Sequence, residues 1–191
     1  MISADLNKFC SRCIYDTRIP NISFNEQGVC NYCCQVDKLI DDFGAGTAKG
    51  EKLLEEIVAE IKHDGQGKKY DCIIGVSGGT DSSYLMLKAK EWQLRPLAVH
   101  YDNTWNSAIA TMNIERVTSA LGIDLFTHVV DNKEVDDIKK SFLLAGVAEF
   151  DADTDIAFVQ VLRSTAARFG VRYILEGHSF VAEGISPVGA N

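Results

Sequence analysis

The sequence contains no apolar run that approaches the roughly 18 residues needed to cross a bilayer. Its first residues also lack the apolar stretch of a signal peptide, because Asp5, Lys8 and the first cysteine stand there. The chain has neither an internal repeat nor a low-complexity tract, which argues against a repeat architecture. We therefore expect a cytoplasmic protein that does not associate with a membrane.

Positive charge is also scarce. The 191 residues include 19 Lys and Arg against 27 Asp and Glu, which gives a formal net charge of -8 and a pI near 5.0. Nucleic-acid surfaces need clustered Lys and Arg to neutralise phosphates, so this balance disfavours a nucleic-acid partner. With 46% hydrophobic residues, the chain is long enough for one well-cored domain and a small appendage.

Cysteines are concentrated near the N-terminal end, where five of the six fall within the first 34 residues. Cys10 and Cys13 form one Cys-x-x-Cys pair, and Cys30 and Cys33 form a second with the same spacing. Two tight turns of this kind offer four thiolates that close a tetrahedron around Zn²⁺ and leave no position open for catalysis. We predict a structural zinc site in a zinc-ribbon-like head, whose binding free energy replaces the core that the segment lacks.

Alternatives stay open for these thiols. An iron–sulfur cluster or a redox-active pair would use the same cysteines, although redox Cys-x-x-Cys motifs lie in a βαβ context that is missing here. Cys34 could also take the place of Cys33. Cys72 stands alone inside a predicted strand, and we interpret it as a small buried hydrophobe.

The sequence divides into three parts. Residues 1–43 form the cysteine-rich head. Residues 44–50 have mostly small side chains, which predicts a flexible linker. Residues 51–191 show regular apolar periodicity. In the third part, short apolar runs alternate with amphipathic segments, which is typical of an α/β protein whose parallel sheet carries helices on both faces. The predicted strands are 72–76, 96–101, 125–130 and 173–175, and the predicted helices begin at Glu51 and span 81–92, 107–121, 134–145 and 155–169.

The turn after the first predicted strand carries the clearest functional signal. In Ser77-Gly78-Gly79-Thr80-Asp81-Ser82-Ser83, two glycines let successive N–H groups point at an anion, and the following helix adds its partial positive charge. The three serines offer hydroxyls to phosphate oxygens, and Asp81 either caps the helix or holds a Mg²⁺ that bridges phosphates. The turn has neither the Walker Gly-Lys-Ser/Thr nor Gly-x-Gly-x-x-Gly. Two interpretations follow, a pyrophosphate cradle or an ordinary β–α turn with an Asp cap.

This string resembles the signature of the PP-loop ATP pyrophosphatases, which have an adenine-nucleotide hydrolase-like, Rossmann-like fold, and the resemblance runs from about Tyr70 to Gly184. It implies that ATP binds with Mg²⁺ and is cleaved between its α- and β-phosphates. AMP is then joined to a carbonyl or amide oxygen, and a nitrogen or sulfur nucleophile displaces it. The nucleotide-binding residues that the resemblance implies are Ser77, Gly78, Gly79, Thr80, Asp81, Ser82, Ser83, Tyr101, Asp102, Arg163 and Gly177. The implied catalytic residues are Asp81, Ser82, His178 and Glu183.

Several of these positions have an ordinary structural interpretation as well. Asp102 and Asn103 are typical turn residues at a strand end, and Arg163 fits a solvated helix position. His178 could serve as a cap or as a hydrogen-bonding group. The paired acids that follow the Gly-His element in the family are absent, and Glu183 matches them only in part.

The head and the loop together resemble the N-acetyl sugar amidotransferases of bacterial surface-polysaccharide synthesis, through Phe9 to Cys33, the loop itself and Ile174 to Gly184. This resemblance implies that the acetamido carbonyl of a nucleotide-activated sugar is adenylated and that ammonia converts it to an acetamidine. No Cys-His-Glu glutaminase apparatus is recognisable in the chain, so a partner glutaminase that channels ammonia is implied. The family continues beyond the equivalent of Asn191, so we expect the α/β domain to be truncated at its C-terminal end.

Two rival functions remain. Some tRNA thiolation enzymes also join a zinc-binding head to a PP-loop domain, but they typically need cysteines after the loop, and this chain has none beyond Cys72. The acidic balance of the chain also disfavours tRNA. The second rival is a non-catalytic module that binds a nucleotide and zinc.

Overall fold

The computed structural model describes residues 8–146 and 151–180. The chain divides into two compact units, of which one comprises the residues up to Glu55 together with those from His178, and the other spans Glu56–Gly177. The predicted linker, 44–50, therefore lies within the first unit. Its last three residues belong to helix α2, which begins at Ala48, so the expectation of a flexible segment is wrong there. Ala and Lys favour helix, and small side chains alone are not a sufficient sign of flexibility.

The head contains a helix that the sequence analysis did not predict. Helix α1 spans Asn31–Phe43, and Cys30 is its N-cap, with a sulfur that accepts a hydrogen bond from the amide of Cys33. The helix ends at Gly44, which has the left-handed conformation that glycine adopts without strain. Residues 8–30 contain turns and two isolated antiparallel bridges, Phe9 with Asp16 and Phe24 with Cys30.

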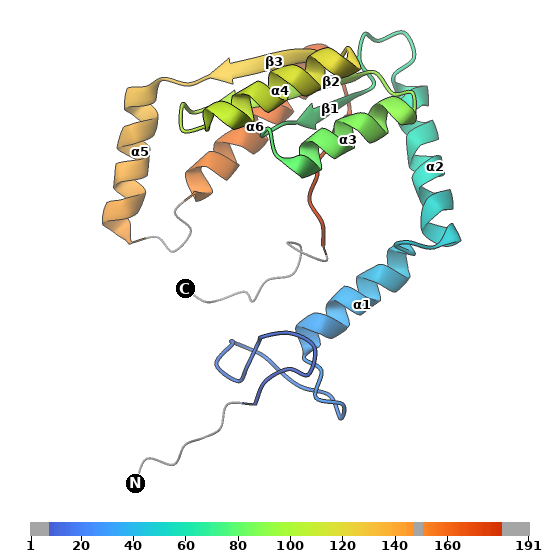
Figure 1. The fold of residues 1–191 in the computed structure, drawn as a ribbon, viewed down its shortest axis with the longest axis vertical. Coiled ribbons are helices and arrows are strands. Elements are labelled where there is room, and N and C mark those ends of the chain that lie inside the picture. Colours follow the sequence, from blue (N-terminus) through green and yellow to red (C-terminus); the bar gives the residue numbers. More distant parts are fainter. Residues whose placement is uncertain (1–7, 147–150, 181–191) are drawn as a thin grey trace. The chain divides into compact units, whose positions relative to one another are not determined.

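The second unit is built on a parallel sheet of four strands in the order β3-β2-β1-β4. This confirms the α/β fold class with its Rossmann-like sheet, and each strand lies within two residues of its predicted bounds. Every strand is connected to the next by at least one helix, as parallel pairing requires (Figure 1). The strands are β1 (Cys72–Gly75), β2 (Pro96–Asp102), β3 (Asp124–Val129) and β4 (Tyr173–Leu175).

Helices cover both faces of this sheet. On one face α2, α3 and α4 pack their apolar side chains against Ile74 and Cys72, whereas on the other face α6 packs against Ile73 and Val99; Figure 1 shows α3 and α4 on the opposite side of the strands from α6. None of the helices within residues 8–146 and 151–180 is long and apolar enough to cross a bilayer. The helices of the chain after α1 are α2 (Ala48–Asp64), α3 (Thr80–Glu91), α4 (Ala108–Leu121), α5 (Asn132–Ala145) and α6 (Ala152–Phe169).

One strand differs from its predicted environment. The apolar run at 125–130 predicts a buried strand, but β3 is exposed over most of its length, with 41% of Leu125 and 63% of Val129 accessible. The reason is its position at the edge of the sheet, where it pairs only with β2. An apolar sequence specifies a strand but does not place that strand within the sheet.

Candidate functional site

The predicted loop leaves the sheet at the point where the strand order reverses. From β1 the chain proceeds outward to β2 and β3, and it then returns to place β4 on the other side of β1. In open parallel sheets, ligands bind beyond the carboxyl ends of the strands at this switch point. The loop after β1 and the segment after β4 therefore flank the position in the sheet where a ligand is expected.

Gly78 determines the shape of the loop. Its φ is +78°, and a β-carbon at this position would collide with the carbonyl oxygen of Ala110 at the start of α4. The Gly78 carbonyl in turn accepts a hydrogen bond from Nδ2 of Asn113, at 3.2 Å. No other residue type satisfies both the dihedral angle and the close approach. The loop is therefore held against α4 by its own backbone.

Ser77 precedes α3, and its hydroxyl accepts the amide of Gly79 at 3.4 Å, whereas the loop residues from Thr80 to Ser83 form the first turn of α3. Gly79 is the N-cap and has no side chain to occupy the free amides of this turn. The hydroxyls of Ser82 and Ser83 donate to the Gly79 carbonyl, at 3.4 and 2.7 Å, while Asp81 is exposed in the same turn. Asp81 is therefore not the helix cap, and the interpretation as a plain turn with an Asp cap does not describe this loop. The first amides of α3 have no side-chain cap and the Asp81 carboxylate beside them is exposed, an arrangement that suits a phosphate and its cation.

Gly177 approaches this turn from the other side of the switch point. A β-carbon on Gly177 would come within 3.1 to 3.3 Å of Asp81 and Ser82, including the Ser82 amide nitrogen at 3.2 Å. The family resemblance implies that Gly177 binds the nucleotide, and the structure places this residue next to the N-terminus of α3. A larger residue there would crowd the amides that are available to an anion.

The end of β2 is joined to the same region through a buried histidine. His100 is 5% exposed, and its Nδ1 lies 3.0 Å from the carbonyl of Val76, the residue before the loop. The next residue, Tyr101, stacks on His128 with ring centroids 6.2 Å apart. Burial is the main cause that raises the pKa of Tyr101, and the negative charge of Asp153 adds to it. The Asp102 carboxylate accepts the amide of Thr104, at 2.8 Å. That contact is typical of a turn residue, so a nucleotide contact by Tyr101 or Asp102 stays a prediction.

The other predicted residues are less closely tied to the loop. Arg163 is exposed on α6, between residues that face the sheet, and within residues 8–146 and 151–180 it has neither a hydrogen bond nor an ion pair. This agrees with a solvated helix position. His178 is exposed and directly follows Gly177. Glu183 lies outside the described residues.

A buried lysine near the end of β2 could not have been found from the sequence. Lys139 of α5 is 3% exposed, and its ammonium donates to Asp151 at 2.5 Å, to Asp153 at 2.7 Å and to Thr154 at 3.1 Å. Burial lowers the pKa of Lys139, but the two carboxylates outweigh burial and raise it above its ordinary value. The hydroxyl of Thr154 also lies 3.5 Å from Nδ2 of Asn103. Lys139 thus connects α5 and α6 beside the carboxyl end of β2.

The four predicted thiols form a second centre in the head. The sulfur atoms of Cys10, Cys13, Cys30 and Cys33 all lie within 4.8 Å of one another, with 3.9 Å between Cys10 and Cys33 and 3.7 Å between Cys13 and Cys30. Four thiolates about 2.3 Å from one tetrahedral Zn²⁺ are about 3.8 Å apart, so the donor set fits a single ion. These separations leave no room for the inorganic core of an iron–sulfur cluster, and Cys34 is exposed and stands outside the group.

Backbone amides prepare this centre for a cation. The sulfur of Cys10 accepts N–H groups from Cys30, at 3.2 Å, and from Arg12, at 3.4 Å. Burial alone raises the pKa of Cys10, but these donors bring it down to about 6. Burial, reinforced by the neighbouring Cys13, raises the pKa of Cys33, and a bound cation favours the ionised form of this thiol. The cluster is therefore consistent with a zinc ligand set.

Comparison with known proteins shows a relative by sequence. The chain matches no protein-family model. It is 29% identical over 171 residues to the uncharacterised protein MJ1599 of Methanocaldococcus jannaschii, and the match covers 88% of this chain and 58% of that protein. The chain therefore spans less than two thirds of the length of this relative.

Solved structures identify the fold. The chain is similar to the NH₃-dependent NAD synthetase of Campylobacter jejuni with a TM-score of 0.52 and 12% identity, over 72% of this chain and 61% of that one. It is also similar to the NMN synthetase of Francisella tularensis, with a TM-score of 0.43 and 17% identity over 63% of this chain and 51% of that one, a score too low to support an argument. At this identity the likeness extends to the fold alone. Residues Glu56–Gly177 have a parallel, Rossmann-like fold of the kind found in NAD synthetases.

Proposed function

We propose that the protein is an ATP-dependent amidotransferase of the ATP pyrophosphatase type. The observation that carries this proposal is the loop after β1, where Gly78 has no room for a β-carbon and the first turn of α3 presents free amides at the switch point of the sheet. The uncapped N-terminus of a helix that follows a glycine loop is a binding site for a pyrophosphate group. The loop lacks a lysine for the γ-phosphate, which favours cleavage between the α- and β-phosphates over phosphoryl transfer.

The residues of the loop have distinct tasks in this reaction. The amides of the α3 terminus hold the leaving pyrophosphate, and Ser82 and Ser83 keep that terminus in shape through their bonds to Gly79. Asp81 is the carboxylate available for a Mg²⁺ that neutralises the departing charge. Gly177 keeps the approach to these amides open.

The acceptor in this proposal is the acetamido group of a nucleotide-activated sugar. Its amide oxygen attacks the α-phosphorus of ATP, and pyrophosphate leaves. Ammonia then adds to the activated carbon, and AMP departs with the former carbonyl oxygen, which leaves an acetamidine after proton loss. The combination of cysteine head and loop supports this acceptor, and the structural neighbour described as NH₃-dependent supports ammonia as the nucleophile. The ammonia would come from a partner glutaminase.

A sulfur-transfer function is less well supported by the residues present. Cys72 is fully buried in β1, and burial, followed by the charge of Asp71, raises its pKa to about 12. A thiol of this kind does not ionise near neutral pH and cannot carry sulfur. Four other cysteines, Cys10, Cys13, Cys30 and Cys33, have their sulfur atoms clustered as one ligand set. Within the part of the chain that the structure describes, Cys34 is then the one remaining thiol, and it precedes the loop.

The test is an analysis of products. The protein is incubated with ATP, Mg²⁺, ammonium and an N-acetylated nucleotide sugar, and the nucleotides and pyrophosphate are separated and quantified. We expect equimolar AMP and pyrophosphate that appear only with the sugar, and we expect Asp81→Asn to lower the rate by about 10²- to 10³-fold. Asp136→Asn, which removes an exposed carboxylate from α5, serves as the control and should leave the rate unchanged.

Three outcomes would count against the proposal. Release of ADP and phosphate would refute adenylation. A requirement for tRNA would move the assignment to thiolation. Tight ATP binding without any turnover, in the presence of both acceptor and ammonium, would leave the non-catalytic module as the better description.

A further inference from the structure

A cavity of about 740 Å³ lies between α3 and α4, on the side of the loop that faces these two helices. The two helices pack against one another along the same face of the sheet. One end of the cavity is formed by Gly78, Gly79 and Thr80, and its walls are formed by apolar side chains that include Leu87, Val117 and Leu121. This volume falls in the range of sites for small molecules and cofactors.

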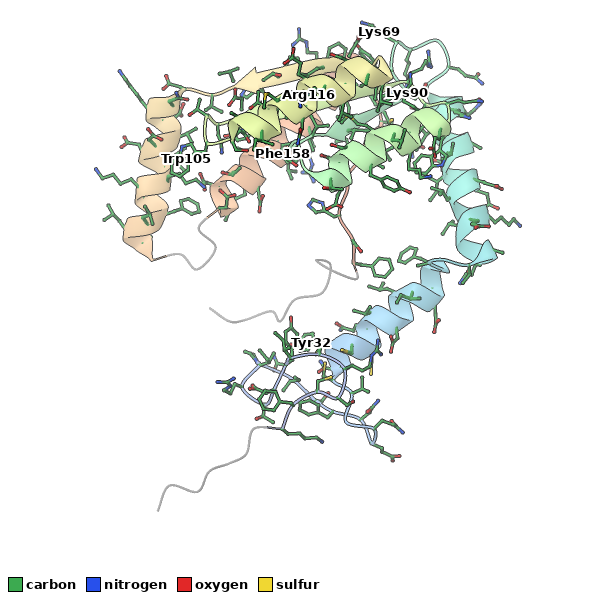
Figure 2. The ribbon with its side chains drawn as sticks, in the orientation of Figure 1. Tyr32, Lys69, Lys90, Trp105, Arg116 and Phe158 are labelled. Carbon is green, nitrogen blue, oxygen red and sulfur yellow. The ribbon has the colours of Figure 1, made fainter. Side chains whose placement is uncertain are left out.

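The polar groups of the cavity lie close to its loop end. Arg116 and Asn113 both line it, and Asn113 is the residue whose amide holds the Gly78 carbonyl. Arg116 follows Asn113 by one turn of α4, about 4.5 Å along the helix axis, so its guanidinium lies within reach of a ligand beside the loop. Within residues 8–146 and 151–180, Arg116 has no hydrogen-bonding or ionic partner; Figure 2 shows it on α4.

An aromatic ring completes the lining. Tyr84 of α3 contributes to the cavity although 57% of it is accessible, and Lys88 lies over its ring, with Nζ 5.4 Å from the centroid. A cavity with apolar walls, an accessible phenol ring and one unpaired guanidinium suits a ligand with a flat, partly apolar body and an anionic group. Nucleoside diphosphates have this composition.

We propose that the cavity between α3 and α4 binds the nucleoside diphosphate part of the acceptor, with Arg116 on the diphosphate and the base against Tyr84 and the apolar walls. The proposal rests on the proposed function in that it takes the acceptor to be a nucleotide-activated sugar. In this arrangement the diphosphate lies beside Gly78 and Gly79, and the sugar attached to it extends along the loop. The acetamido group is then brought to the amides where ATP is cleaved.

The negative net charge of the protein makes the positive charge of Arg116 important for binding an anionic ligand. The net charge of -8 opposes the approach of an anionic acceptor, and a local positive group offsets this repulsion. A guanidinium binds a diphosphate through paired hydrogen bonds, which a neutral side chain cannot supply. Removal of Arg116 should therefore weaken the acceptor more than it weakens ATP, whose phosphates are held by backbone amides.

The experiment measures binding without turnover. The protein is saturated with a non-hydrolysable ATP analogue and Mg²⁺ so that the loop is filled, and UDP is then titrated by calorimetry, with GDP in parallel. We expect one molecule of diphosphate per chain. Arg116→Ala should weaken it by at least tenfold and Tyr84→Ala by a smaller factor, with the affinity for the ATP analogue unchanged. Lys90→Ala is the matched control, because Lys90 is an exposed cation on α3 outside the cavity (Figure 2).

Each contrary result has a definite meaning. The proposal is overturned if neither diphosphate binds, or if the Arg116→Ala variant binds diphosphate as tightly as the parent protein does. It is also overturned if diphosphate and the ATP analogue compete for a single site. If the parent protein proves to be a dimer that binds no diphosphate and Arg116→Ala makes it a monomer, the cavity is a protein interface instead. The proposed function fails separately: if diphosphate binds through Arg116 but no acceptor yields AMP, the cavity stands and the amidotransferase reaction does not.

Discussion

In the head, the buried apolar side chains are few and gather around Cys10 and Cys30, whereas in Glu56–Gly177 they form a cluster on each face of the sheet. Within residues 8–43 the head has turns, two isolated bridges and one helix, and four of its sulfur atoms lie within 4.8 Å of one another. A small segment with so little apolar burial needs another source of stability, and a bound metal is one. The α/β unit thus has an apolar core on each face of its sheet, whereas the head has a thiol cluster that suits a stabilising ion.

The polar groups of the two regions also differ in whether they leave a position free for a ligand. The four thiols face one another and close around a single point, which suits a structural ion. The loop after β1 instead has an exposed Asp81 carboxylate beside a helix terminus that no side chain caps. A closed donor set stabilises a fold and an open one binds a ligand, so the chemistry of this protein is expected at the loop and not at the cysteines.

The largest expected effect is the loss of the head when its metal is removed. Structural zinc contributes on the order of 10 kcal/mol to the folding of small zinc domains. We expect a chelator, or Cys30→Ser, to abolish the ordered signals of the head in NMR spectra, while the amide signals of β1 and β2 keep their positions. Cys34→Ser is the matched control, because this neighbouring thiol is exposed and outside the cluster.

The zinc content of the variants tests whether the four thiols bind a metal. We expect one zinc per chain in the parent protein and in Cys34→Ser, measured by mass spectrometry of the metal. A full equivalent of zinc in Cys30→Ser would contradict the four-thiolate site. Iron in place of zinc would keep the site and change the ion.

The next largest effect concerns the charge buried in the α/β unit. Lys139→Met leaves Asp153, which is 9% exposed, without its cation, and loss of one partner from a buried ion pair costs about 3–5 kcal/mol. We expect the midpoint of urea unfolding to fall accordingly. Lys140→Met, which changes the exposed lysine beside it, should have little effect. Equal midpoints for the two variants would show that the ion pairs of Lys139 add nothing to stability.

Two glycines with similar backbone angles provide a finer test of the loop. Gly78 and Gly122 have φ of +78° and +61°, but a β-carbon would collide with Ala110 only at Gly78 and meets nothing within 4 Å at Gly122. Gly122→Ala should therefore cost only the left-handed conformation, about 1–2 kcal/mol. Gly78→Ala should cost more and should also weaken ATP binding. If thermal unfolding shows the same loss for both, the close contact between loop and α4 is not real.

The smallest effect should come from a surface carboxylate at the sheet edge. Asp124 accepts the hydroxyl of Tyr70 at 2.7 Å and lies 2.9 Å from the ammonium of Lys69, and Lys69 and then Tyr70 lower its pKa. A lowered pKa contributes stability that is fully present above the ordinary value near 3.8 and is lost as the pH falls through the folded value. Asp124→Asn should therefore lower the Tm slightly at pH 7, and the difference should shrink as the pH falls below 3.8. A difference that stays constant with pH would assign the effect to packing.

Much of the fold was accessible from the sequence because its signals are local. Apolar runs bounded by turn residues predicted the four strands, and helical spacing predicted the helices between them. The loop was recognisable because the glycine pair and the hydroxyl residues occupy consecutive positions at a strand–helix junction. The helix of the head escaped prediction because Cys30 caps it through a sulfur, and cysteine is not among the residues that normally signal a helix start.

By itself the sequence determined the parallel α/β fold, the paired cysteines and the loop, because each depends on residues that are neighbours in the chain. Only the tertiary structure decided that β3 is an exposed edge, that Gly177 stands against the start of α3, and that Lys139 is buried between two helices. These properties depend on which segments meet in space. A lysine or an apolar strand has the same local sequence whether it is buried or exposed, and only its partners make the difference.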